Sequence, residues 1–267
     1  MSDIQELIQR RNNIKSVQEI TDAMQIIATI MIGKAQKLLN YRKKIQPYYD
    51  RLFFTRHIDE LEKSKNSEKW LIAFFSEKGF CGGYNSQLVP FLLAHKETKN
   101  IIIVGDKGRA ICRKHRIKYT AFYNSSSRVP HETIVYDIFE TFKKNNFPWD
   151  VKVVINKYNN MFSQVPKVVD FFPVHEEIYR NIEATVDMSL GVINQIILEK
   201  YIRDRLFYFF IQNYTGETAA KLLMMKSAVD NAEKLGEELG KDIQKARQHQ
   251  ITQDLSEIIG AYKVLSS

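Results

Sequence analysis

The feature that most constrains the fold is the segment 216–259, which contains no proline and carries apolar residues every three or four positions. This period is that of one face of an α-helix. The predicted seam consists of Leu222, Met225, Val229, Ala232, Leu239, Ile243 and Ala246. Because several of these positions repeat at the heptad spacing of a coiled coil, the helix is expected to need a partner along its whole length.

The predicted partner is the other end of the chain, where the segment 4–32 contains neither glycine nor proline. Its apolar residues again recur at steps of three or four: Ile14, Val17, Ile20, Met24, Ile27 and Met31. The prolines all lie between the two helical ends, at positions from 47 to 173. The chain therefore divides into an N-terminal helix (1–60), a central domain (68–173) and a C-terminal helix (180–267).

The central domain alternates predicted strands and helices. Short runs rich in branched and aromatic residues at 70–76, 101–104 and 151–155 indicate buried strands. Helical spacing at 86–96 and 134–143 separates them. This alternation is typical of an α/β layer with some parallel pairing. The predicted fold class is α/β with long helices: an antiparallel coiled coil of the N- and C-terminal helices plus a central Rossmann-like α/β domain.

Two glycine clusters, at 79–83 and 105–108, follow predicted strands. Neither has the GxGxxG spacing of a dinucleotide site or the Lys-Ser/Thr of a Walker loop, so we expect tight strand-to-helix turns and no nucleotide or other cofactor. The cysteines, Cys81 and Cys112, lack metal-ligand spacing and are expected to be reduced, structural thiols. Since HExxH and GxSxG are also absent from the sequence, no catalytic residues and no metal site are predicted.

The net charge of +8 raises the possibility of a nucleic-acid partner. We interpret the excess as diffuse, since the cluster Arg42-Lys43-Lys44 is short and no segment alternates basic and aromatic residues. Acidic protein surfaces account for the charge equally well, so nucleic acid is not expected as a partner. The sequence also lacks a long apolar run and a signal-peptide pattern, and the cytoplasm is the expected location.

Several motifs, in order along the whole chain, resemble the γ subunit family of rotary F-type ATP synthases. They are IKSVQEITDAMQIIA (14–28), FSEKGFCGGYN (75–85), VGDKGR (104–109), INKYNNMFSQVP (155–166), GETAAKLLMMKSAVDNA (216–232) and KARQHQITQDLSEIIG (245–260). The two C-terminal motifs are similar to the family's SExxARMxAMxxATxNA and RARQxxITxExxEIxxG.

The resemblance implies a non-catalytic subunit that serves as a central rotor stalk. Its coiled coil would stand, in one copy per complex, inside a hexamer of α and β subunits. Its α/β domain would contact the ε subunit and the membrane c-ring. Rotation would couple to conformational change in the catalytic β subunits, so that ATP is made or hydrolysed there. The complex would lie on the cytoplasmic, inner face of the cell membrane.

The resemblance also implies five contact residues. The family's torque-coupling methionine corresponds to Met24, and the arginine of its ARM motif corresponds to Lys221. The groups that contact a loop of a β subunit correspond to Arg247, Gln248 and Thr252. Arginine and amide side chains form directional hydrogen bonds that can be made at some rotor angles and lost at others.

The chain departs from the family at 28–36, where ATIMIGKAQ replaces a more basic run. Met31 and Gly33 stand at two usually positive positions, and Lys221 lacks the bidentate geometry of arginine. These changes leave open a specialised rotor used mainly for hydrolysis. A different alternative is a coiled-coil adaptor with an α/β head.

Overall fold

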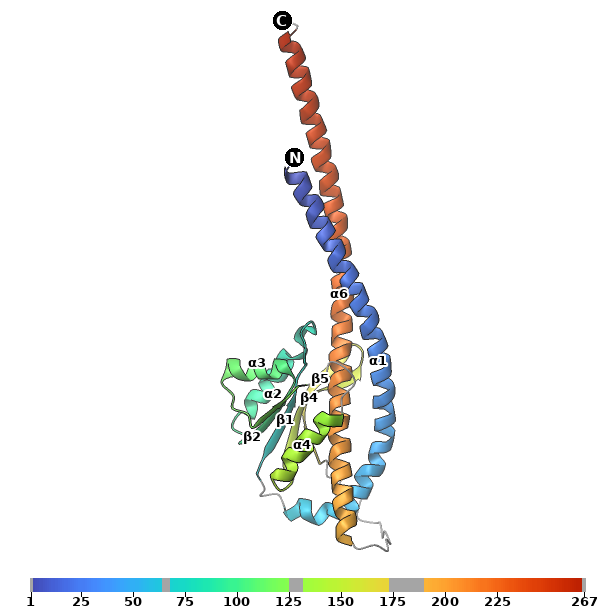
Figure 1. Ribbon diagram of the computed structural model, residues 1–267, viewed down its shortest axis with the longest axis vertical. Helices are drawn as coiled ribbons and strands as arrows, with labels where there is room; N and C mark the ends of the chain where they lie inside the picture. The colour runs from blue at the N-terminus through green and yellow to red at the C-terminus, as the bar shows by residue number, and fades with distance from the viewer. Residues whose placement is uncertain (1, 64–67, 125–131, 173–189, 266–267) are drawn as a thin grey trace. The chain divides into compact units, whose positions relative to one another are not determined.

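The computed structural model describes residues 2–63, 68–124, 132–172 and 190–265. Along the chain, the long helix α1 (Ser2–Lys63) comes first and the long helix α6 (Leu190–Leu265) comes last, with a mixed sheet and shorter helices between them (Figure 1). Contacts divide the chain into two compact units. The helical unit comprises residues 1–27 and 223–267, and the sheet unit comprises residues 28–222.

The sheet unit is built on five strands in the order β3-β2-β1-β4-β5. The strands are β1 (Trp70–Phe74), β2 (Asn100–Val104), β3 (Ala121–Tyr123), β4 (Val151–Asn160) and β5 (Ser163–Asp170). Strand β1 pairs in parallel with β2 and β4, and β2 pairs in parallel with β3, whereas β4 and β5 form an antiparallel hairpin. The central strand β1 is buried at every residue, as a strand covered on both faces should be.

Helices cover both faces of this sheet. On one face, Leu71 and Ile103 pack with Leu92 of α2 (Val89–Ala94) and Cys112 of α3 (Asp106–His115). On the other face lie α4 (Glu132–Lys144) and the parts of α1 and α6 that belong to this unit. There the Phe53 ring of α1 stacks on the Tyr201 ring of α6, with centroids 3.9 Å apart. This doubly covered sheet confirms the Rossmann-like interpretation.

The three predicted strands and the helix predicted at 134–143 are present. The helix predicted at 86–96 is shorter, because two 3-10 turns, Gly82–Tyr84 and Ser86–Leu88, precede α2. Helix α3 was not predicted, because Gly105 and Gly108 suggested only a turn. Strand β5 was also not predicted, since Pro166 interrupts its apolar pattern; an edge strand tolerates proline.

In the helical unit, α1 and α6 run antiparallel, which confirms the predicted pairing (Figure 1). Met225, Leu239 and Ile243 of the α6 seam are 4–6% exposed, and Val229, Ala232 and Ala246 are half-buried. From Ile251 to Tyr262, however, every α6 residue is exposed. The predicted seam, which ends at Ala246, is therefore covered throughout, whereas the last turns of α6 beyond it are not covered.

The predicted seam of α1 is wrong in its details. Val17, Ile20, Met24 and Ile27 are 41–61% exposed. Ile14 and Met31 of the predicted seam are half-buried, as expected. Between them, the less exposed positions are Gln18, Thr21, Gln25 and Ala28. Thr21 can turn inward because its hydroxyl donates a hydrogen bond to the Val17 carbonyl 2.7 Å away, within its own helix. The apolar stripe of α1 therefore remains on the surface.

The division of the chain into 1–60, 68–173 and 180–267 stays a prediction. The predicted start of the last segment, at residue 180, lies outside the described residues. Within the described ranges, no helix is both long enough and apolar enough to cross a membrane.

Candidate functional site

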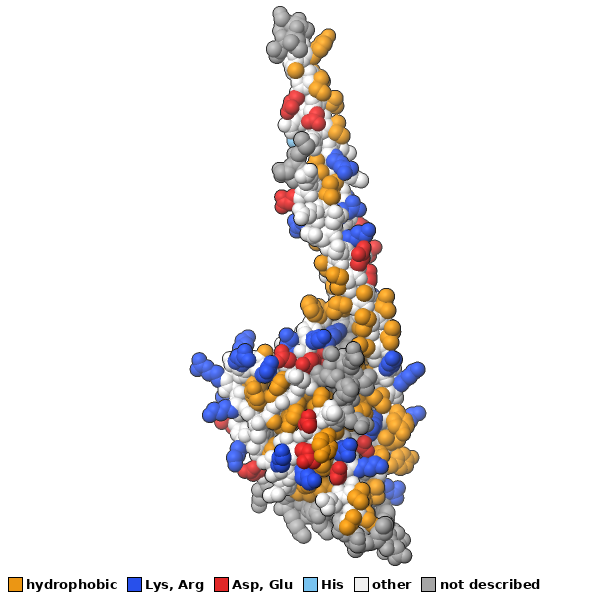
Figure 2. All heavy atoms as spheres, in the orientation of Figure 1, with side chains coloured by type: hydrophobic (Ala, Val, Ile, Leu, Met, Phe, Trp, Pro, Cys, Tyr) orange, Lys and Arg blue, Asp and Glu red, His pale blue; other side chains and the backbone are white. Residues whose placement is uncertain are grey.

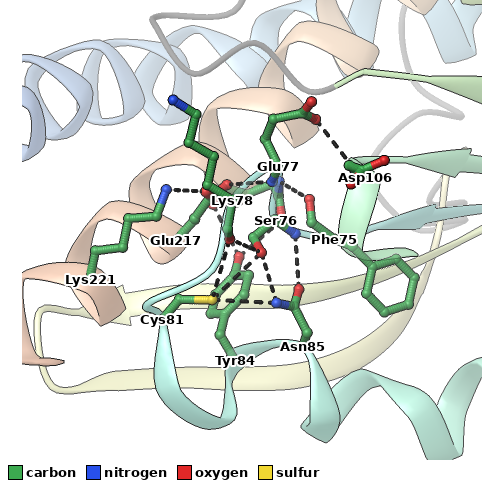
Figure 3. A network of polar contacts seen from close by, with 11 residues as sticks. Phe75, Ser76, Glu77, Lys78, Cys81, Tyr84, Asn85, Asp106, Glu217 and Lys221 are labelled. Carbon is green, nitrogen blue, oxygen red and sulfur yellow. Dashed lines mark hydrogen bonds and ion pairs between the residues drawn. The ribbon is translucent and has the colours of Figure 1, made fainter. Parts of the chain in front are cut away.

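The turn after β1 is held by a compact polar network in the sheet unit (Figure 3). The Ser76 N–H donates to Asn85 Oδ1 at 2.9 Å, and Asn85 Nδ2 donates back to Ser76 Oγ at 2.7 Å. The Ser76 hydroxyl in turn donates to the Lys78 carbonyl at 2.8 Å. The buried Cys81 thiol lies 3.5 Å from Ser76 Oγ. These bonds together hold the GFCGG turn in one conformation.

Glu77 joins this turn to two other elements. Its side-chain Oε2 accepts a hydrogen bond from the Asp106 N–H, 3.3 Å away, at the start of α3. Its own N–H donates to Glu217 Oε2 on α6, 3.4 Å away. A helix N-terminus is where a phosphate group would bind in a nucleotide site. Here the Glu77 carboxylate accepts a hydrogen bond from one of the N–H groups at the helix N-terminus, the Asp106 N–H.

The glycines of the second turn are explained by close packing. Gly105 has a φ of +95°, and a Cβ there would lie 2.4 Å from the Phe75 carbonyl oxygen. A Cβ on Gly108 would lie 2.4 Å from Phe75 Cδ2 and 2.7 Å from Ile103 Cγ2. Both positions therefore need glycine so that α3 can approach β1 and β2. This is the role expected for glycines that form turns and do not bind phosphate.

Helix α6 closes the network from the other side. Asn213 Nδ2 donates to the Phe75 carbonyl at 3.0 Å, and the Tyr84 hydroxyl lies 3.0 Å from both oxygens of Asn213. Burial raises the pKa of Tyr84 well above its ordinary value, with Glu217 adding to the effect. At Gly216, a Cβ would meet the Tyr84 hydroxyl at 3.0 Å. The turn after β1 and helix α6 therefore pack closely against each other.

Glu217 and Lys221 form an ion pair one helical turn apart on α6 (Figure 3). The Glu217 side chain is 6% exposed and that of Lys221 is 25% exposed. Burial raises the pKa of the Glu217 carboxyl, while Lys221 and the backbone N–H groups of Glu77 and Lys78 act in the opposite direction. Lys221, which the resemblance assigns to a contact with another subunit, is here engaged within its own chain.

Met24 lies in the helical unit, on the stripe of α1 that the structure leaves exposed. Its side chain is 41% exposed. The same stretch of α1 exposes five other large apolar residues: Val17, Ile20, Ile26, Ile27 and Ile30. Met24 is therefore part of an apolar surface patch and does not fill the α1–α6 seam.

Arg247, Gln248 and Thr252 lie on neighbouring turns of α6 in the helical unit, and all three are exposed. The Thr252 hydroxyl donates to the Gln248 carbonyl at 2.9 Å, which holds its rotamer against the helix. Beside and beyond them, α6 exposes Ile251, Leu255, Ile258, Ile259 and Tyr262. The polar groups predicted to act in coupling therefore border a second apolar surface.

The cysteines behave as expected for structural thiols. Cys81 and Cys112 are free and buried. Burial raises the pKa of the Cys112 thiol to about 11, which keeps it protonated and unreactive near neutral pH. Within the described residues no cluster of three or more His, Cys, Asp or Glu side chains is arranged to hold a metal ion.

Sequence reasoning did not identify Glu77, Asn213 and Glu217 as members of one network. Glu77 and Glu217 are far apart in the chain, so no local spacing connects them. A weak signal was available for Glu217, because a Glu four residues before a Lys favours an ion pair on a helix.

The family model described as ATP synthase matches residues 3–265. The chain belongs to this family. It is 28% identical to the ATP synthase gamma chain of Saccharopolyspora erythraea, over 100% of this chain and 99% of that protein. It is 25% identical to the ATP synthase gamma chain of Mycoplasma mobile, over 97% and 98% of the two chains. The chain spans essentially the full length of both relatives.

Solved structures show the same fold. A chain of the Euglena gracilis mitochondrial ATP synthase (OSCP/F1/c-ring, rotational state 3) matches with a TM-score of 0.73 and 17% identity, over 99% of this chain and 95% of that one. A chain of the rotor of the same synthase, in rotational state 1, matches with a TM-score of 0.65 and 17% identity, over 94% and 99%. The similarity includes both the long terminal helices and the sheet.

Proposed function

We propose that this chain is the γ subunit, the central rotor stalk, of a rotary F-type ATP synthase or ATPase. The observation that carries the proposal is the family match over residues 3–265, together with gamma-chain relatives that align over nearly their whole length. In this role the chain performs no chemistry of its own. It couples rotation to conformational change in catalytic β subunits.

The apolar surfaces of the helical unit support a role inside a larger assembly. The patch around Met24 and the last turns of α6 expose apolar side chains that are 41–73% accessible. Contiguous apolar surface of this kind marks contact sites between proteins. A cavity formed by α and β subunits would cover it, while the coiled coil could still turn against a surface that offers few directional bonds.

Arg247, Gln248 and Thr252 would supply the directional part of the interaction, and Met24 the apolar part. Exposed arginine and amide groups can form hydrogen bonds with an acidic loop of a β subunit at some rotor angles only. A conformational change needs such a difference in interaction free energy between states. Lys221 would contribute by holding Glu217 in place through their ion pair, beside any direct contact with a β subunit.

The remaining partners follow from the same role. The sheet unit would contact the ε subunit and the c-ring, and the complex would hold one copy of this chain at the cytoplasmic face of the membrane. The substitutions at Met31 and Gly33 leave a specialised rotor, in a complex that mainly hydrolyses ATP, as the alternative to a synthase rotor. Nothing lies within 4 Å of a Cβ placed on Gly33, so packing does not require this glycine.

The test is reconstitution with α and β subunits from the same cell. Because Cys81 and Cys112 are buried, a cysteine placed at exposed Lys114 would label selectively and carry a bead. We expect a complex with one copy of the chain by native mass spectrometry, and ATP-driven rotation of the bead. An adaptor would assemble without rotating, and a chain that does not assemble with α and β subunits would contradict the proposal.

A further inference from the structure

A strongly basic segment lies on α3 and the residues that follow it. Between positions 107 and 118 the sequence has six Lys or Arg and no Asp or Glu: Lys107, Arg109, Arg113, Lys114, Arg116 and Lys118. The whole chain has a net charge of +8, so the rest of it carries only +2 (8 − 6). The interpretation of the charge excess as diffuse is therefore wrong for this segment.

The fold turns this charge outward. Gly108 and Cys112 form the inner side of α3 and are buried against the sheet. Arg109, Arg113, Lys114, Arg116 and Lys118 are all exposed, and we call this set the α3 basic face. Figure 2 shows Lys and Arg side chains gathered over this part of the sheet unit. The patch is therefore a surface feature of a rigidly packed helix.

The α3 basic face has few partners within the chain. Arg109 pairs with Asp106 at 2.6 Å and lies over the Phe122 ring, with its Cζ 4.7 Å from the centroid. For the other four side chains of the face, no carboxylate among the described residues lies within ion-pair distance. Most of this charge is thus available to a second molecule.

The helix dipole explains only part of the pattern. Cations are favourable in the last turn of a helix, where Arg113 and Lys114 stand. They are unfavourable in the first turn, where Lys107 and Arg109 stand. Arg116 lies just beyond the helix, at a left-handed φ of 54°, and Lys118 follows it. The like charges of this face repel one another, and the fold does not require them. We therefore infer that they bind an anion outside the chain.

We propose that the α3 basic face docks an acidic, Asp/Glu-rich segment of a partner protein. Its arginines match carboxylates, since the guanidinium fork forms paired hydrogen bonds with them. Tyr119, at 39% exposed, is the one large apolar side chain strongly exposed between 106 and 120. The face therefore offers one aromatic side chain, fewer than the successive stacking residues of a single-strand binder or the apolar anchors of a membrane-surface helix. This docking goes beyond the rotor function and is independent of it.

The test measures binding of the full-length chain to a labelled peptide of repeated Glu-Glu-Ser by fluorescence anisotropy. The variant R113Q/K114Q/K118Q removes three charges from the face. The control K37Q/K43Q/K44Q removes three exposed lysines from α1. We expect the first variant to bind about tenfold more weakly and the control to change little. Thermal unfolding should be the same for all three proteins, because the substituted residues are exposed.

Further measurements distinguish an acidic peptide from a lipid surface and a nucleic acid as the ligand. R109K/R113K keeps the charge but removes two of the three guanidinium groups of the face, and should weaken peptide binding while leaving its salt dependence in place. Vesicles of phosphatidylcholine with phosphatidylserine, and single-stranded oligo-dT, are expected to bind more weakly than the peptide at equal ionic strength. Equal losses in the two triple variants, or tighter binding of vesicles or oligo-dT than of the peptide, would overturn the proposal.

Discussion

Replacing Lys221 with methionine should destabilise the sheet unit strongly at neutral pH and much less in mild acid. Methionine keeps most of the side-chain volume but removes the charge that faces Glu217, whose side chain is 6% exposed. Removing one partner of a buried ion pair costs about 3–5 kcal/mol. Because the Lys221 side chain is 25% exposed, we expect about 2–3 kcal/mol at neutral pH.

The loss of stability depends on pH, because the variant can avoid an unpaired buried charge by protonating Glu217. Burial already raises the pKa of Glu217, and losing Lys221 raises it further. Protonating a carboxyl of ordinary pKa costs about 4 kcal/mol at pH 7 and about 1 kcal/mol at pH 5, so these values are the ceiling for the penalty. The native state with a raised carboxyl pKa is favoured below the unfolded pKa and loses that advantage as pH rises. The destabilisation should therefore grow from pH 5 to pH 7.

Urea unfolding of the full-length chain at both pH values is the measurement. K226M serves as a matched control, because Lys226 is an exposed lysine on the same helix. The double variant E217Q/K221M removes both charges and should recover most of the lost stability. If K221M and K226M unfold at the same urea concentration at pH 7, or if the loss is equal at both pH values, the buried-pair argument fails. The Glu217–Lys221 pair would then contribute little to stability, and the intersubunit contact that the resemblance implies would be the better account of Lys221.

Three further predictions concern packing and coupling. Gly108→Ala should lower the unfolding free energy by about 1–3 kcal/mol, because the added methyl group would overpack against Phe75. Gly236→Ala should raise it by about 0.5–1 kcal/mol, because nothing lies within 4 Å of the added Cβ. Urea unfolding of both variants measures these changes. Leu239→Asp, at a seam position that is 4% exposed, should lower the melting temperature of the helical unit followed by circular dichroism; an unchanged melt would contradict the seam. Replacing Arg247, Gln248 and Thr252 together with alanine should reduce ATP turnover of the assembled complex more than it reduces assembly, as measured by ATPase rate and native mass. Unchanged turnover would show that these residues are ordinary helix surface.

The sheet could be predicted from sequence where burial alone decides the pattern. The runs at 70–76, 101–104 and 151–155 are almost wholly apolar because both faces of those strands are covered. Helix α3 could not be predicted in this way. Gly105 and Gly108 are glycines because Phe75 and Ile103 come close to them, and that contact exists only in the folded sheet unit. A glycine that permits close approach has the same sequence signal as one that ends a helix.

The polar network after β1 was beyond sequence reasoning for a similar reason. Ser76 and Asn85 lie near each other in the chain, and a turn between them was predictable. The link to Glu217 depends instead on how α6 packs against the turn, 140 residues further along. Motif resemblance drew attention to both segments, but only the fold shows that Glu77 joins them.

The two faces of α1 show why an apolar stripe does not by itself identify a helix's partner. A stripe reports that apolar surface is covered in the functional state, whichever molecule covers it. In α1 the side facing α6 carries Gln18, Thr21 and Gln25, while Val17, Ile20 and Met24 face outward. A chain that folded and worked alone would place those two sets the other way round. The inversion is accounted for if α1 was selected to contact a second protein as strongly as its own chain, and the exposed last turns of α6 require the same explanation.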